Sequence, residues 1–119
     1  MSGFQQQTTA VVAVTTKLTG SSVTTIVDGT DSAVIVHRLQ FNENAGSTPN
    51  LTVDMYDGTT TYYLGVGGTV WRAKAVTAGQ SVEFTDIVVP KGFKIRATSS
   101  DAAGKFDVVG VTALRSTNG

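Results

Sequence analysis

The sequence has no cysteine, only two prolines and a single histidine among its 119 residues. Without cysteine, disulfide frameworks, thiol catalysis and thiolate metal sites are excluded. The one histidine, His37, cannot by itself supply a transition-metal site, which needs several ligands. No apolar run approaches the ~20 residues of a membrane-spanning helix, and residues 1–7 lack the charged and apolar regions of a signal peptide. We therefore expect neither a metal cofactor nor a membrane partner.

Charge is also scarce. Nine lysines and arginines balance nine aspartates and glutamates, and only 15% of the chain is charged. Nucleic-acid-binding domains carry a basic patch, so no nucleic-acid partner is expected. The glycines of Gly65-Val66-Gly67-Gly68 are not followed by the Lys-Ser/Thr of a phosphate-binding loop, and they are more typical of a turn or bulge. The sequence predicts no cofactor.

The abundant residues are threonine (19), valine (17) and glycine (13). β-Branched residues favour strands, and turn residues about every 8–12 positions are typical of an antiparallel sandwich. We predict an all-β fold, a single antiparallel β-sandwich, jelly-roll or immunoglobulin-like, with about eight or nine short strands and essentially no helix. The predicted strands are residues 9–18, 22–27, 33–42, 50–56, 59–66, 69–76, 81–89, 94–99 and 105–114.

Two parts of the chain differ in character. Residues 1–8 are polar, rich in glutamine and without periodicity, and Phe4 is their one apolar residue besides the initiator. Such a segment cannot bury enough surface to offset the entropy of ordering it. We expect residues 1–8 to be an arm that is ordered only by a partner, and residues 9–119 to form the β-sandwich domain.

The segment 50–66 predicts a hairpin in detail. Asp57-Gly58 is favoured in a two-residue type I′ turn, and this turn would place Met55 opposite Thr60 and Val53 opposite Tyr62. That register puts the apolar residues of both strands on a core face. The predicted core face holds Leu51, Val53, Met55, Tyr62, Leu64 and Val66, and the opposite face holds Thr52, Asp54, Tyr56, Thr61 and Tyr63.

Strand alternation also predicts which side chains meet a partner. In the segment 69–76, Trp71, Ala73 and Ala75 alternate with Arg72 and Lys74, so one face of this strand should be wet or lie at an interface. Aromatic residues and arginine are enriched at protein interfaces. The candidate interface residues are Phe4, Tyr56, Tyr63, Trp71, Arg72 and Lys74.

Residue types that could carry chemistry have simpler explanations. His37 lies inside a predicted strand with no nucleophile motif nearby, which indicates a strand histidine rather than a catalytic base. The acids of Asp28-Gly29-Thr30-Asp31 could help to bind calcium, but Asx-turns account for them. Asp54 and Asp107 lie on the polar side of their strands and are expected to be solvated. Exposed aromatic residues could also form a surface on which a sugar ring stacks, so sugar binding is kept as an alternative.

Four stretches carry a resemblance to a known family. Residues 32–42 form an apolar strand that runs into an Asn-rich turn, and 57–64 read Asp-Gly-Thr-Thr-Thr-Tyr-Tyr-Leu. Turns follow at 77–79 and 89–92, and 94–100 with 106–108 form a closing pair of strands. These stretches resemble small β-rich virion proteins of tailed bacteriophages, which include capsid decoration (cement) proteins. Residues 27–31 depart from the family's Pro-Ala-Gly turn, and 65–76 resemble an insertion that carries Trp71.

The resemblance implies a structural virion protein without catalytic residues. It implies a capsid decoration or cement protein that is made in the host cytoplasm and bound at the capsid surface. Its partners would be the major capsid protein or other virion proteins, and it would be a homo-oligomer, for example a trimer. A head–tail connector, collar or tail or fibre component is the alternative, and a carbohydrate-binding β-sandwich module is the second alternative.

Overall fold

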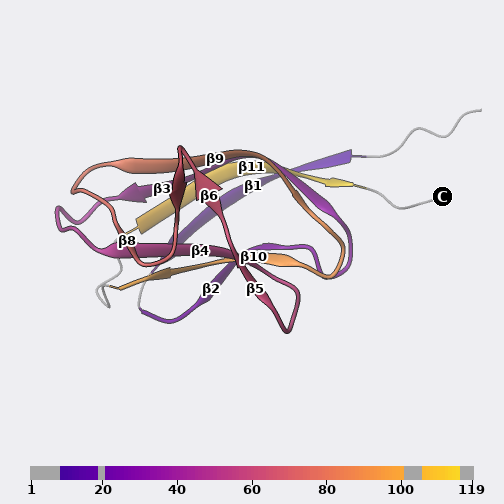
Figure 1. Ribbon diagram of the computed structural model, residues 1–119. Coiled ribbons are helices and arrows are strands. Elements are labelled where there is room, and N and C mark those ends of the chain that lie inside the picture. The colour runs from indigo at the N-terminus through magenta and orange to yellow at the C-terminus, as the bar shows by residue number, and fades with distance from the viewer. Residues whose placement is uncertain (1–8, 19–20, 101–105, 116–119) are drawn as a thin grey trace, which may run out of the picture.

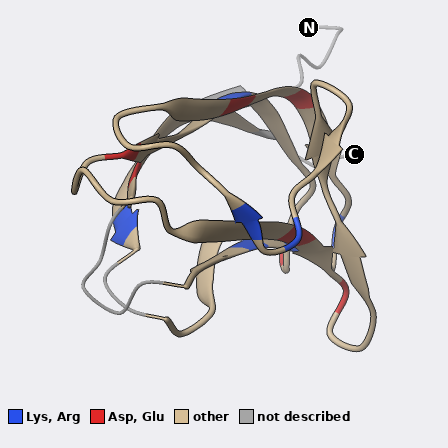
Figure 2. Ribbon diagram, turned by 60° about the vertical axis from the view of Figure 1, so that its left-hand side comes forward, with Lys and Arg blue, Asp and Glu red and all other residues tan. Residues whose placement is uncertain are grey.

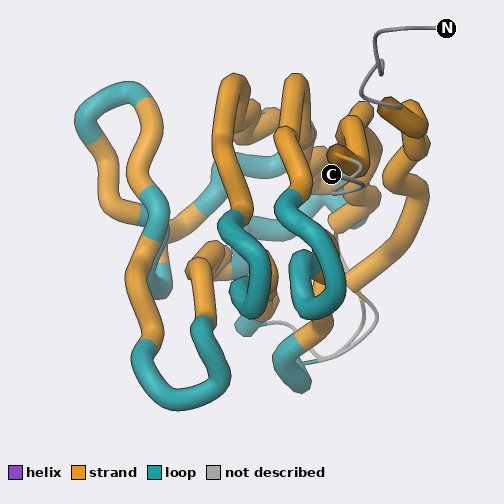
Figure 3. Tube along the Cα trace, turned by 90° about the vertical axis from the view of Figure 1, so that its right-hand side faces the viewer, coloured by secondary structure: helices purple, strands orange, loops and turns teal. Residues whose placement is uncertain are grey.

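The computed structural model describes residues 9–18, 21–100 and 106–115 of the chain. These residues form two packed layers of antiparallel strands joined by loops, and they contain no helix (Figures 1 and 3). Accordingly, no helix in this part of the chain is long and apolar enough to cross a membrane. The strands are β1 (Thr9–Leu18), β2 (Thr24–Asp28), β3 (Val34–Glu43), β4 (Asn50–Tyr56), β5 (Thr61–Tyr63), β6 (Gly65–Val66), β7 (Thr69–Val70), β8 (Lys74–Ala75), β9 (Ser81–Val89), β10 (Lys94–Ser99) and β11 (Phe106–Arg115).

The strand order defines a jelly roll. One sheet has the order β1-β11-β3-β9, and the other has the order β2-β10-β4-β5. The first strand therefore pairs with the last, β2 with β10, β3 with β9, and β4 with β5, as in one long hairpin. The hairpin is rolled up so that β11 also pairs with β3, and β10 with β4. This nested pairing is the jelly-roll form of the sandwich and differs from the immunoglobulin order.

Most predicted strands are confirmed to within two residues of their bounds, but two of them are divided. The predicted strand 59–66 is β5 and β6, and the predicted strand 69–76 is β7 and β8. The division occurs at the edge of β4, where Leu64 N donates to Val53 O and Val53 N donates to Trp71 O. The chain leaves this edge after Leu64, forms the small β6–β7 hairpin, and returns to the edge at Trp71.

The hairpin between β4 and β5 has a different register from the one predicted. Met55 pairs with Tyr62 and not with Thr60, so the register is shifted by two residues and the loop spans 57–60. The Asp57 carboxylate accepts the backbone N–H groups of Thr59 and Thr60, which holds the wider loop and replaces the type I′ turn. Because the shift is even, Asp54, Tyr56, Thr61 and Tyr63 keep the predicted common face.

One prediction follows for the turn. Gly58 has a φ of 98°, and the space around its α-carbon is open. Gly58→Val forces a β-branched residue into a left-handed conformation and should lower the free energy of unfolding by about 1–3 kcal/mol. Chemical denaturation measures this change. A Gly58→Val protein as stable as the wild type would show that this backbone conformation is not required by the loop.

The core lies between the two layers and follows the predicted alternation. Leu39 and Phe41 of β3 are buried while Arg38 is exposed, and the Phe41 and Phe84 rings meet edge to face at 5.9 Å. The prediction that Tyr62 belongs to the core is wrong, because its side chain is 51% exposed. Tyr62 lies on the edge strand β5, where its ring is tilted against that of Phe93, with the centroids 6.5 Å apart.

Candidate interface surfaces

The outer face of the β2-β10-β4-β5 sheet carries a polar cluster centred on Arg96. Its Nε donates to Asp54 Oδ1 at 2.9 Å, and its Nη2 donates to Thr61 Oγ1 at 3.2 Å. Its guanidinium lies 3.8 Å from the centroid of the Tyr56 ring, and the Tyr56 hydroxyl donates to Gly58 O. These groups are brought together because β10 and β5 place Arg96 and Tyr63 on either side of Asp54. The cluster binds three strands to one another.

This cluster corrects one sequence-based expectation. Asp54 is on the predicted polar face, but it is 4% exposed and not solvated. Neighbouring long side chains on the same face cover its carboxylate, and Arg96 supplies the opposite charge. Strand alternation shows only the face on which a residue lies, and not whether its neighbours shield it from water.

The predicted interface residues do not all share one environment. Tyr63 is 38% exposed, and the Arg72 guanidinium lies 4.6 Å from the centroid of its ring. Arg72 and Lys74 are exposed, whereas Tyr56 is half-buried beneath Arg96. Phe4 lies outside the described residues. The structure therefore brings Tyr63 and Arg72 together at the surface and uses Tyr56 within the domain.

Trp71 departs from its predicted setting. The segment around it is not a continuous strand, because Ala73 has a φ of 51° and ends the predicted alternation. Trp71 is half-buried and packs against the core. It lines an open pocket together with Val66 of β6 and Val82 of β9.

Sequence reasoning missed two exposed apolar side chains in the same region. Tyr62 is 51% exposed and Val70 is 55% exposed. Tyr62 was assigned to the core face of the predicted strand 59–66, whereas Val70 was assigned to neither face. In the structure β5 is an edge strand, and β7 pairs with β6 outside the two large sheets. We call the exposed side chains of residues 62–74 the β5–β8 surface. Its members are Tyr62, Tyr63, Val70, Arg72 and Lys74.

Glu43 is the other buried acid, 4% exposed at the end of β3. Its carboxylate accepts the backbone N–H groups of Ala45 (3.0 Å), Gly46 (3.1 Å) and Gly79 (3.0 Å). The hydrogen bond from Gly79, reinforced by the other two, lowers the pKa of Glu43 below its usual value of 4.5. The side chain ties the loop after β3 to the loop before β9, which is a structural task for a charged carboxylate.

The lowered pKa of Glu43 predicts a pH dependence of stability. A depressed pKa in the folded state stabilises the protein above about pH 4.5, and this contribution is lost as pH falls through the folded value. Glu43→Gln should therefore unfold at lower urea concentration than the wild type at pH 7. The difference should shrink in acid, as urea titrations across this range would measure. A difference that does not depend on pH would contradict a role for the charge.

The remaining candidates for chemistry have structural environments. His37 is exposed at an irregularity of β3 opposite β11. The Asp28 carboxylate accepts the backbone N–H of Thr30 at 2.9 Å in an Asx-turn. Within residues 9–18, 21–100 and 106–115, no group of three or more acids and histidines could hold a metal ion. An arginine guanidinium lies over each of the Tyr56 and Tyr63 rings, at 3.8 Å and 4.6 Å from the ring centroids.

Charged residues occur in both layers and in the loops (Figure 2). Two ion pairs lie at exposed positions, Lys17 with Asp107 and Arg38 with Glu83. Asp107 is half-buried in β11 and also accepts a hydrogen bond from Asn44. Both ion pairs thus connect neighbouring strands, β1 with β11 and β3 with β9.

Comparison with known proteins gives likeness of fold only. No protein-family model and no curated protein sequence matches the chain. Among solved structures, a chain of the infectious bursal disease virus Gx strain is similar over 97% of this protein (16% identity, TM-score 0.49). The cyanophage Pam1 capsid asymmetric unit contains a chain that is similar over 92% (20% identity, TM-score 0.41), of which 83% is covered.

A viral particle of infectious bursal disease virus contains another similar chain, with 13% identity and a TM-score of 0.41 over 90% of this protein. The protein spans about a third of the length of the two bursal disease virus chains, 33% and 35%. These three chains come from virus structures.

Proposed function

We propose that this protein is a noncatalytic structural component of a bacteriophage virion that decorates or cements the capsid. The observation that carries the proposal is the jelly-roll strand order, an architecture used by viral capsid domains. The resemblance of four sequence stretches to phage virion proteins supports the same role. A cementing protein needs a rigid domain that binds through area and shape.

The internal pairing of polar groups agrees with this role. The Arg96 guanidinium and the Asp54 and Glu43 carboxylates are held by groups of the domain itself. In each case a charged group is used to connect strands or loops, and its hydrogen bonds rigidify the sandwich. Rigid presentation of a surface favours binding because less freedom is lost on association.

The attachment site that we propose is the β5–β8 surface. It combines exposed tyrosines and a valine with Arg72 and Lys74, and aromatic residues and arginine are the side chains enriched at protein interfaces. The Arg72 guanidinium lies 4.6 Å from the centroid of the Tyr63 ring, a cation–π contact that favours this arrangement of the two side chains. The partner would be the major capsid protein or a neighbouring virion protein.

Tyr63→Ser tests this site. The side chain is partly exposed, so the variant should melt within about 2 °C of the wild type. Its affinity for capsids that lack the protein should fall roughly thirtyfold, since an interface aromatic is worth ~2 kcal/mol or more. Co-sedimentation with such capsids measures the change. Val88→Ser, at a 61% exposed position on β9, is the matched control and should bind normally.

Wild-type binding by Tyr63→Ser would remove the β5–β8 surface as the attachment site. The number of copies in purified virions tests the location itself. A capsid decorator is expected in hundreds of copies, and a neck or tail component in about six to a few dozen, as closed ring symmetry allows. Absence from purified virions would overturn the proposed function.

A further inference from the structure

The edges of the two sheets differ in how well they are protected. An exposed strand edge offers unpaired backbone groups to any other strand, and proteins blunt such edges with charges, proline, short strands or irregularities. The outer edge of β4 is covered by β5, Leu64, Trp71 and β8. The edge strand β2 has only five residues, and its register against β10 is irregular.

The edge strand β9 is protected in a similar way. It carries Glu83 and Asp86, and Asp86 has a φ of 56° that interrupts the regular strand. Pro90 follows directly after it. The two acidic side chains, the irregular backbone at Asp86 and the proline at the end of the strand all disfavour pairing of a second strand along β9.

The edge strand β1 has none of these protections. It is ten residues long and lies at the end of its sheet, paired on one side with β11. From Thr9 to Thr16 it contains no charge, no proline and no glycine. Its single charge, Lys17, is paired with Asp107. Among the strands that the structure describes, β1 is the long edge open to another strand.

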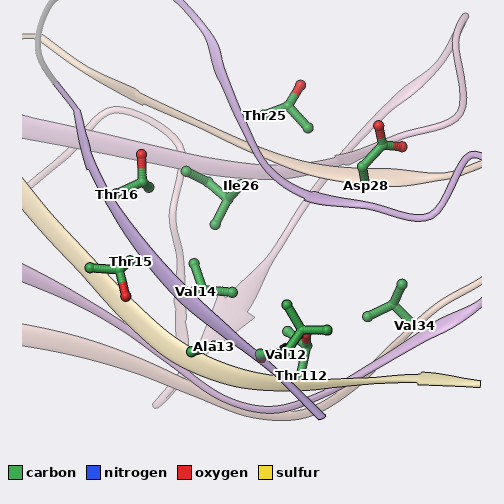
Figure 4. A pocket seen from close by; sticks show the side chains of 10 residues that line it. All are labelled: Val12, Ala13, Val14, Thr15, Thr16, Thr25, Ile26, Asp28, Val34 and Thr112. Carbon is green, nitrogen blue, oxygen red and sulfur yellow. Dashed lines mark hydrogen bonds between the residues drawn. The ribbon is translucent and has the colours of Figure 1, made fainter. Parts of the chain in front are cut away.

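An apolar groove lies beside β1, where the sandwich is open between β1 and β2 (Figure 4). It has a volume of about 300 Å³, and its apolar lining includes Val12, Val14, Ile26 and Val34. The inward side of β1 is fully buried at Leu18, half-buried at Val14, and 45% exposed at Val12. The core is therefore left open towards the start of β1.

We propose that β1 pairs antiparallel with β1 of a second copy of this chain, so that the two four-stranded sheets become one continuous sheet across a two-fold axis. When the antiparallel pairing is centred on Ala13, the uncharged residues 9–16 of each copy all lie within the paired region. It places Ala13 opposite Ala13 of the second copy, and Lys17 opposite Thr9 of the second copy. Parallel pairing would set the two lysines side by side.

The same register covers the open groove. Val12 lies opposite Val14 of the second copy, so the exposed and half-buried inward valines of each chain meet across the axis. Main-chain hydrogen bonds supply the affinity in such edge pairing, and the side chains of one face supply the specificity. A two-fold axis repeats both valine contacts, since each copy presents the same surface. The dimer is independent of the proposed virion role.

The full chain can be tested by sedimentation velocity over a range of concentrations. The wild type should form dimers. Ala13→Glu places two like charges directly opposite each other and should raise the dimer dissociation constant more than about tenfold. Thr85→Glu, at an exposed position of the edge strand β9, is the matched control and should dimerise normally. Thermal melting checks that both variants are folded.

The absence of cysteine allows a second, independent test. Directly opposed residues of antiparallel strands have Cα atoms ~4.5–5.5 Å apart, within the range that a disulfide spans. Ala13→Cys should therefore form a disulfide-linked dimer under mild oxidation, and Thr85→Cys should not. A wild type that stays monomeric, a trimer, or a dimer insensitive to Ala13→Glu would each overturn the proposal. So would equal cross-linking of the two cysteine variants.

Discussion

Replacing Arg96 with alanine should lower the free energy of unfolding by about 3–5 kcal/mol, because the substitution leaves Asp54 as a buried charge without its partner. The side chains of this pair are only 19% and 5% exposed, and their hydrogen bond is 2.9 Å long. The same substitution removes the bond to Thr61 and the stacking on Tyr56. Urea or guanidinium denaturation at pH 7 measures the loss.

Arg38→Ala is the matched control. Arg38 pairs with Glu83 at a similar distance, 2.7 Å, but the two side chains are 57% and 40% exposed. Exposed ion pairs contribute about 0–1 kcal/mol, so this variant should be close to the wild type. The double variant Asp54→Ala/Arg96→Ala should recover part of the loss, since no unpaired charge remains. If Arg96→Ala and Arg38→Ala lowered the free energy of unfolding equally, burial of the Arg96–Asp54 pair would not explain its contribution to stability.

Gly110→Ala should also be strongly destabilising, by about 2–5 kcal/mol. Gly110 lies in β11, which is paired on both sides, and it is opposite Leu39 of β3. A methyl group at this position would overlap the backbone carbonyl oxygen of Arg38 and would lie 3.1 Å from the Leu39 Cα. These are backbone atoms of the neighbouring strand, so relief requires the two strands to move apart.

Val109→Ala provides the comparison for this variant. Val109 is the preceding residue of β11 and is 36% exposed on the outer face. Its truncation should cost less than about 1 kcal/mol. Thermal and chemical denaturation of both variants shows whether the loss of stability comes from the steric overlap at residue 110 or from any substitution in β11. A Gly110→Ala protein as stable as Val109→Ala would show that β11 and β3 are not held as closely as the structure describes.

The strands and the core were predictable because they depend on local patterns. Leu39 and Phe41, Val82 and Phe84, and Ile95 and Ala97 alternate with polar residues, and all six are buried. A strand has a side-chain period of two, so the pattern can be recognised within a few residues. The same parity argument assigned the common face of Asp54, Tyr56 and Tyr63 even though the exact register was wrong.

The candidate surface was predicted only in part. Tyr63, Arg72 and Lys74 are exposed as the alternation suggested. Tyr62 is exposed and not in the core, and Trp71 is half-buried beside the β6–β7 hairpin, which leaves the sheet edge. This excursion depends on two backbone hydrogen bonds of Val53, which accepts from the Leu64 N–H and donates to the Trp71 carbonyl, and no pattern within the segment 59–76 reveals them.

The fold class, most strand positions and most core residues could be predicted from the sequence, because β-branched content, turn residues and a period of two act over short distances. The tertiary structure was needed to distinguish a jelly roll from an immunoglobulin-like order, since strand partners far apart in the chain, such as β1 and β11, leave no signal in spacing. It also decided that Asp54 is buried and that β1 is an unprotected edge. Burial of a polar-face residue and exposure of an edge depend on which strands lie alongside, and that is a property of the assembled sheets.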